Sequence, residues 1–98
     1  MVYMLYESYP HPAIEVIVAE HALKHGLTER QIRYAWGHYL AMQHRAAPAE
    51  DEVIAVGYEQ TGRLVQLVAV ERKQVQIIYH AMSPPTRRML AELGLRRR

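Results

Sequence analysis

The clearest pattern in the sequence is a helical spacing of apolar side chains near residue 30. These side chains recur every three or four positions and are Ile32, Ala35, Trp36 and Tyr39. The spacing gives one apolar stripe and predicts an amphipathic helix. Thr28 followed three residues later by Gln31 is a capping-box sequence, and Leu27 just before the cap suits a hydrophobic staple. We therefore expect the helix to begin after Thr28 and to run to about Leu40.

The segment before this helix, residues 13–25, carries two conflicting patterns. Its β-branched run, residues 16–18, is typical of a short strand. Side chains at helical spacing favour a helix instead, and these are Ile14, Ile17, Val18, His21 and His25. We expect a helix over at least the second half of the segment. It should end at Gly26, because glycine readily adopts the left-handed backbone that follows a helix.

Beyond residue 40 the apolar period changes to two, which is the period of a strand. The predicted strands, of which the first is the weakest, are residues 41–46, 53–58, 63–70 and 75–81. The connections between the last three are short, which implies antiparallel pairing. Pro84 and Pro85 break the last strand, and residues 86–93 form a short helix ended by Gly94.

The order of these elements predicts an α+β fold in one domain that spans residues 1–98. Two N-terminal helices pack on one face of a three- or four-stranded antiparallel sheet, and a short C-terminal helix follows. Residues 1–12 are expected to be irregular because they contain two prolines, and residues 95–98 are expected to form a basic tail.

Composition points to a cytoplasmic protein. The chain has no cysteine, which excludes a disulfide framework and a thiolate metal site. Residues 1–12 hold no Lys or Arg and no long apolar run, unlike a signal peptide. No apolar stretch approaches the ~18 residues that a membrane span requires. We therefore expect a soluble protein of a reducing cytosol, with no membrane partner.

The distribution of charge changes the picture more than the net charge of +2 does. Residues 1–71 hold five Lys or Arg and nine Asp or Glu, whereas residues 72–98 hold seven Lys or Arg and one Glu. A basic end on an acidic body favours contact with phosphate or with an acidic protein surface. The alternative is a basic tail that only adds solubility.

The basic end also carries candidate chemistry. His80 closes the last predicted strand just before Arg87 and Arg88. A histidine moves protons near neutral pH, and arginine binds phosphate and stabilises its transition-state charge. RNA cleavage by a 2′-hydroxyl needs a base, an acid and a cation, and no metal. His25 and Arg63 complete this candidate set if the fold brings the residues together. The alternative is a strand histidine beside a solvated basic helix.

Two other interpretations of the N-terminal half remain open. His21 and His25 are four residues apart, which is a metal-ligand spacing on a helix. The zinc-protease signature is absent, however, and a third ligand, such as His80 or a carboxylate, would have to come from elsewhere in the chain. We therefore expect no metal site. The glycine turn before Thr28 also permits a helix-turn-helix with Arg30, Gln31 and Arg33 facing DNA, although the capping box and staple explain these positions better.

One short motif resembles a known family. Lys24-His25-Gly26-Leu27-Thr28 is similar to the KHG-[VIL]-[ST] segment near the start of BrnT-type toxins, which are small members of the RelE/ParE toxin superfamily. The apolar segment 63–70, the run 77–81 and the basic pair Arg87-Arg88 resemble the later pattern of that family. The chain differs at Met82, where the family usually has a basic residue.

The resemblance implies a RelE-like fold and an endoribonuclease that blocks translation, the toxin of a type II toxin–antitoxin system. It also implies two partners, RNA and a cognate antitoxin protein, and no cofactor. Lys24, His25, Arg87 and Arg88 match its motifs, whereas His80 rests on the residues alone.

The resemblance and the charge pattern together give two sets of candidate residues. The candidate catalytic residues are His25, His80, Arg87 and Arg88, and the candidate RNA-binding residues are Lys24, Arg63, Arg72 and Lys73. The alternative function is a non-catalytic module that binds nucleic acid or protein. A further alternative is a surface for a protein partner or for self-association, formed by the seven tyrosines with Met82 and Met89.

Overall fold

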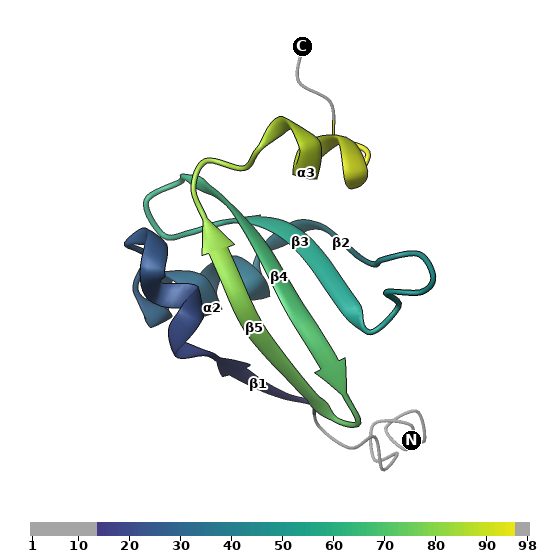
Figure 1. Cartoon of the computed structure of the whole chain (residues 1–98). Helices are drawn as coiled ribbons and strands as arrows, with labels where there is room; N and C mark the ends of the chain where they lie inside the picture. The colour runs from purple at the N-terminus through teal and green to yellow at the C-terminus, as the bar shows by residue number, and fades with distance from the viewer. Residues whose placement is uncertain (1–13, 96–98) are drawn as a thin grey trace, which may run out of the picture.

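The computed structural model describes residues 14–95 and is built around one five-stranded sheet (Figure 1). The strands are β1 (Glu15–Val18), β2 (Tyr39–His44), β3 (Glu52–Tyr58), β4 (Leu64–Arg72) and β5 (Val75–Met82). The helical segments of the described chain are the 3₁₀ helix η1 (Glu20–His25) and the α-helices α2 (Glu29–Gly37) and α3 (Arg87–Glu92). The strand order is β1-β5-β4-β3-β2.

The sheet is mixed, so the prediction of three or four antiparallel strands is wrong. Strands β2 to β5 form the expected antiparallel meander. β1, however, pairs in parallel with β5, from Glu15 beside Val75 to Val18 beside Ile78. The β-branched run at residues 16–18 therefore joins the sheet, as the strand pattern indicated. The helical spacing in the same segment was misleading.

The prediction of two N-terminal helices is also wrong, because only α2 is an α-helix in this half of the described chain. Residues 20–25 form a single short 3₁₀ helix, which Gly26 ends with a φ of 86°. α2 stops at Gly37 rather than near Leu40, since the chain enters β2 at Tyr39. The RelE-like arrangement that we expected, with two helices on an antiparallel sheet, is thus replaced by a mostly β structure.

The start of α2 is as the sequence predicts. The Thr28 hydroxyl accepts a hydrogen bond from the Gln31 N–H at 3.0 Å, and the Gln31 side chain accepts one from the Thr28 N–H at 2.9 Å. This reciprocal pair satisfies two N–H groups that a helix start leaves without partners. Ile32, Ala35 and Trp36 then turn their buried side chains toward the sheet.

The sheet buries a core on each face, so the three helical segments do not share one face. η1 and α2 cover one core, whose centre is formed by Ile32, Val65, Leu67 and Ile78. α3 crosses the opposite face, as Figure 1 shows, where Met89 and Leu93 pack on Ile54 and Val68. The central strands therefore bury both faces, which explains the nearly unbroken apolar sequences of β3 and β4.

A bulge in β5 decides which side chains reach the α3 face. Val68 pairs with His80, but the next residue of β4, Ala69, pairs with Ile78. Tyr79 is thus the additional residue that a β-bulge inserts. Because directly paired residues share a face of the sheet, His80 lies with Val68 on the face that α3 covers.

Candidate functional site

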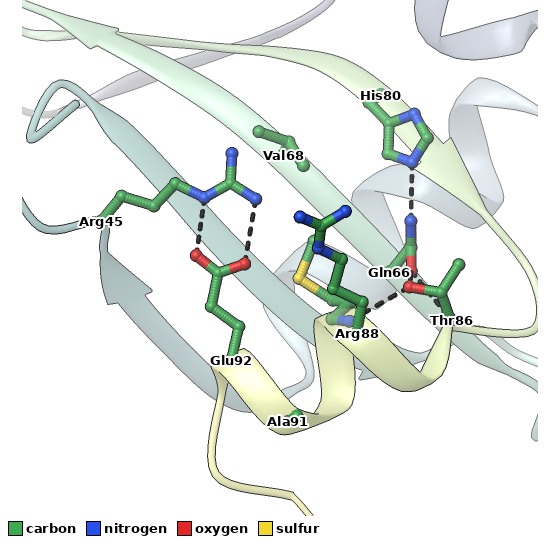
Figure 2. A pocket seen from close by; sticks show the side chains of 9 residues that line it. Arg45, Gln66, Val68, His80, Thr86, Arg88, Ala91 and Glu92 are labelled. Atoms are coloured by element: carbon green, nitrogen blue, oxygen red, sulfur yellow. Dashed lines mark hydrogen bonds and ion pairs between the residues drawn. The ribbon is translucent and has the colours of Figure 1, made fainter.

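A groove of about 770 Å³ lies between α3 and the sheet. Figure 2 shows it from close by, with side chains from β4, β5 and α3 around Arg45, which follows β2. The lining residues are Arg45, Gln66, Val68, His80, Thr86, Arg88, Met89, Ala91 and Glu92. Arginine, histidine and amide side chains on an apolar floor are a combination suited to an anionic ligand.

Gln66 links His80 to the first turn of α3. Its Oε1 accepts hydrogen bonds from the backbone N–H of Thr86 at 2.8 Å and from the Thr86 hydroxyl at 3.2 Å. Its Nε2 lies 2.9 Å from Nε2 of His80. The Thr86 hydroxyl in turn accepts from the N–H of Met89 at 3.1 Å and so caps α3. Gln66 is one of two buried polar or charged residues in the described chain.

His80 also touches η1. The N–H of Ala19 donates to the carbonyl of Ile78 at 2.9 Å, which brings η1 against the part of β5 that lies beyond β1. The rings of His25 and His80 meet edge to face, with 5.6 Å between their centroids. Burial lowers the pKa of His80 below its usual value, and the basic neighbours His25, His21 and Lys24 lower it further. These surroundings therefore favour the neutral form of the His80 ring.

Arg45 closes the other end of the groove through carboxylates. Its guanidinium donates to both carboxylate oxygens of Glu92, at 2.8 and 3.1 Å, and to Glu52 at 2.6 Å. These bonds raise the pKa of Arg45 and, through Arg45, lower that of Glu92. Tyr79 donates to the same Glu52 at 2.9 Å, and burial followed by this contact raises the pKa of Tyr79. Arg45 is thus already partnered and joins α3 to β3.

Arg88 is the cation of the groove that remains available. Its side chain extends from α3 between Arg45 and His80 (Figure 2). In residues 14–95 no ion pair involves Arg88. Its neighbour Arg87 is exposed and does not line the groove. Of the candidate catalytic residues, His80 and Arg88 thus line the groove, His25 contacts the ring of His80 from η1, and Arg87 is not among the lining residues.

The candidate RNA-binding residues divide into two groups. Lys24 is exposed on η1 next to His25. Arg63 lies in the β3–β4 turn and donates to the buried carboxylate of Glu59 at 2.7 Å. Arg72 pairs with Asp51 at 2.8 Å, and Lys73 lies beside it in the β4–β5 turn with a φ of 53°. None of the four lines the groove, and of them only Lys24 is near enough to act on the charge of His80.

The β4–β5 turn is far from the groove for a simple geometric reason. Arg72 is four residues along β4 from Val68, the partner of His80. At ~3.3 Å per residue this is about 13 Å along the strand. Residues that are close in sequence, such as Lys73 and His80, thus lie at different ends of one hairpin.

Sequence reasoning missed Gln66, Arg45 and Glu92. A signal existed for Gln66, because it is the only polar residue in the apolar run from Leu64 to Val70. A polar side chain in a strand buried on both faces needs a buried partner. No such signal exists for Arg45 and Glu92, which are 47 positions apart and meet only in the folded chain.

Within residues 14–95 no group of three or more His, Asp or Glu side chains could hold a metal ion. No helix in the same range is long and apolar enough to cross a membrane. Comparisons of the chain with family models, with curated proteins and with solved structures find no match.

Proposed function

We propose that this protein is a bacterial toxin that cleaves RNA at the groove beside α3, and that a cognate antitoxin restrains it. The observation that carries the proposal is a groove lined by His80 and Arg88, with the ring of His25 on η1 in contact with that of His80. The motif around Lys24 and His25, which resembles BrnT-type toxins, supports the same function independently of the groove.

The chemistry is an internal transfer of the phosphodiester. The 2′-hydroxyl oxygen attacks the phosphorus while a histidine takes its proton. The bond from phosphorus to the 5′ oxygen breaks, and that oxygen leaves with the electron pair and receives a proton. The products are a 2′,3′-cyclic phosphate and a 5′-hydroxyl end. Arg88 binds the non-bridging oxygens and stabilises their added charge.

A second candidate function, non-catalytic RNA binding, has an observation in its favour. Gln66 already occupies Nε2 of His80, and both carboxylates near Arg45 already neutralise that cation. A groove of this kind binds a phosphate through Arg88 without cleaving its ester. It predicts salt-dependent affinity, because phosphate contacts release counterions.

The test uses the purified full chain and end-labelled RNA, with binding and cleavage measured in the same samples. We expect cleavage that leaves a cyclic phosphate, reduced at least ~100-fold in His25→Ala by loss of acid–base catalysis. Arg88→Ala should weaken both binding and cleavage. Matched controls are His44→Ala, whose ring contacts Glu50 and Glu71, and Arg72→Ala at the far turn.

The outcomes separate the two candidates. Cleavage that His25→Ala and Arg88→Ala reduce and the controls retain supports the toxin. Binding that depends on Arg88 and on salt, without any cleavage, leaves the binding module as the function. RNA that is neither bound nor cut overturns both.

A further inference from the structure

The contacts of the Gln66 amide fix its orientation. A backbone N–H only donates, so the atom of Gln66 that faces the Thr86 N–H at 2.8 Å must be the oxygen. The nitrogen of the amide then faces His80 at 2.9 Å. An amide NH₂ also only donates, so Nε2 of His80 must supply the lone pair that accepts this bond.

We propose that Gln66 is a positioning residue that holds His80 as the neutral tautomer, with the proton on Nδ1 and the Nε2 lone pair facing the amide. The reverse amide orientation sets two donors against each other at Thr86, in a place where Gln66 is only 5% exposed. Buried donors that lose their acceptors are strongly disfavoured. The N-cap of α3 thus determines the tautomer of a histidine on β5.

The charges around His80 act in the same direction. On η1 it faces His21, Lys24 and His25, and α3 contributes Arg88 across the groove. The carboxylate of Glu92 also lines the groove but is bonded to Arg45. Burial and these neighbours disfavour a second proton on the ring. Protonation at Nε2 would also break the bond from Gln66.

The tautomer changes the role of His80 in the reaction. Among the described residues, Nδ1 of His80 has no hydrogen-bond partner. Since no side-chain nitrogen or oxygen of these residues is both buried and unpaired, Nδ1 is not buried. It lies on the side of the ring away from Gln66 (Figure 2). Because Gln66 engages Nε2, the acid–base work of the proposed reaction falls to His25. This assignment of roles rests on the proposed function, whereas the tautomer does not.

The first experiment is a long-range ¹H–¹⁵N spectrum of the free wild-type protein, which distinguishes the two ring nitrogens of a histidine. We expect His80 to show a protonated Nδ1 and an unprotonated Nε2 at pH 7. A protonated Nε2 in the neutral ring overturns the proposal. This measurement needs no variant and so does not depend on whether a substitution at Gln66 folds.

The second experiment reverses the polarity of the contact. In Gln66→Glu one carboxylate oxygen still accepts from Thr86, but the other now faces Nε2 of His80 and requires a proton there. We expect the spectrum to switch to a protonated Nε2, and the proton affinity of His80 to rise at least ~10-fold from the adjacent negative charge. A folded variant with an unchanged His80 spectrum and pH titration contradicts the proposal.

Gln74→Glu is the matched control, because Gln74 is exposed in the β4–β5 turn, beyond Arg72. Arg72 is about 13 Å along β4 from Val68, the partner of His80, so the His80 spectrum should not change. The two proposals fail differently. A wild type with the expected tautomer that neither binds nor cuts RNA overturns the proposed function alone. Cleavage by a protein with a protonated Nε2 in the neutral ring overturns the role of Gln66 alone.

Discussion

Gly57 provides the sharpest test of how α2 packs on the sheet. It is buried near the end of strand β3, beneath the end of α2. A Cβ added at Gly57 would lie 2.1 Å from the carbonyl oxygen of Ala35 and 3.0 Å from that of His38. Ordinary contact begins at 3.4 Å, so Gly57→Ala requires a separation of about 1.3 Å between helix and strand.

Side-chain rotation cannot remove this clash, because the atoms that the new Cβ would meet belong to the backbone. Overpacking of a core typically costs ~1–3 kcal/mol, and a backbone clash belongs at the upper end of that range. We therefore expect Gly57→Ala to lower the free energy of unfolding by about 3 kcal/mol. For a domain of this size that corresponds to a fall in Tm of about 12–24 °C.

Urea titration gives the free energy of unfolding, and the m-value checks that the unfolding reaction is unchanged. Gly37→Ala is the control, since a Cβ there meets no atom within 4 Å. It should be neutral or stabilise by up to about 1 kcal/mol, because the variant reduces the entropy of the unfolded chain. A Gly57→Ala variant within about 1 kcal/mol of the wild type would contradict the close contact between α2 and β3.

Three further predictions concern the cap, the β3–β4 turn and the α3 contact. Thr28→Ala removes the acceptor for Gln31 and should cost about 1 kcal/mol in a urea titration, with an unchanged midpoint arguing against the capping box. Hydrogen bonds from the turn lower the pKa of Glu59 from its usual 4.5 to about 2. The charged Glu59 thus stabilises the fold fully above pH 4.5, and this stabilisation is lost as the pH falls toward 2. Between these pH values the free energy of unfolding of Glu59→Gln should therefore fall less steeply than that of the wild type. Equal slopes would exclude this role. Glu92→Gln leaves Arg45 with one carboxylate partner. Because these side chains are about one-third exposed, the free energy of unfolding should fall by only about 1–2 kcal/mol, as measured by thermal unfolding. A gain in stability would show that the pair does not hold α3.

The parts of the fold that the sequence predicted are those set by local signals. The capping box at Thr28 and Gln31 and the apolar stripe that follows them depend on residues within one helix. The turns between β3, β4 and β5 join strands that are neighbours in sequence. Each of these elements forms by short-range contacts, which is why spacing alone locates it.

The parts that were missed depend on distant pairing. Residues 15–18 form a strand because they pair with β5. In that pairing Glu15 lies beside Val75, which is 60 positions later in the sequence. The bulge at Tyr79, which turns His80 toward α3, likewise leaves no mark in the apolar pattern. The basic residues near the C-terminus looked like one group, but the length of the β4–β5 hairpin separates Arg72 from Arg88.

The candidate site was therefore predicted in part. Of the candidates, His25 and Arg88 were proposed from the motif and from their chemistry, and His80 from its chemistry alone. Gln66, which orients His80 in our proposal, was passed over because it stands inside an apolar strand. A polar residue in such a strand is the kind of signal that sequence reasoning can use.

The most direct test of the central claim is the controlled induction of this chain in a bacterial host, with growth and total RNA followed in parallel. The account predicts arrest and RNA decay with the wild type and with Arg72→Ala, and neither with a His25→Ala/Arg88→Ala double variant of equal abundance. Normal growth with intact RNA in the wild type, or decay that the double variant retains, would contradict it.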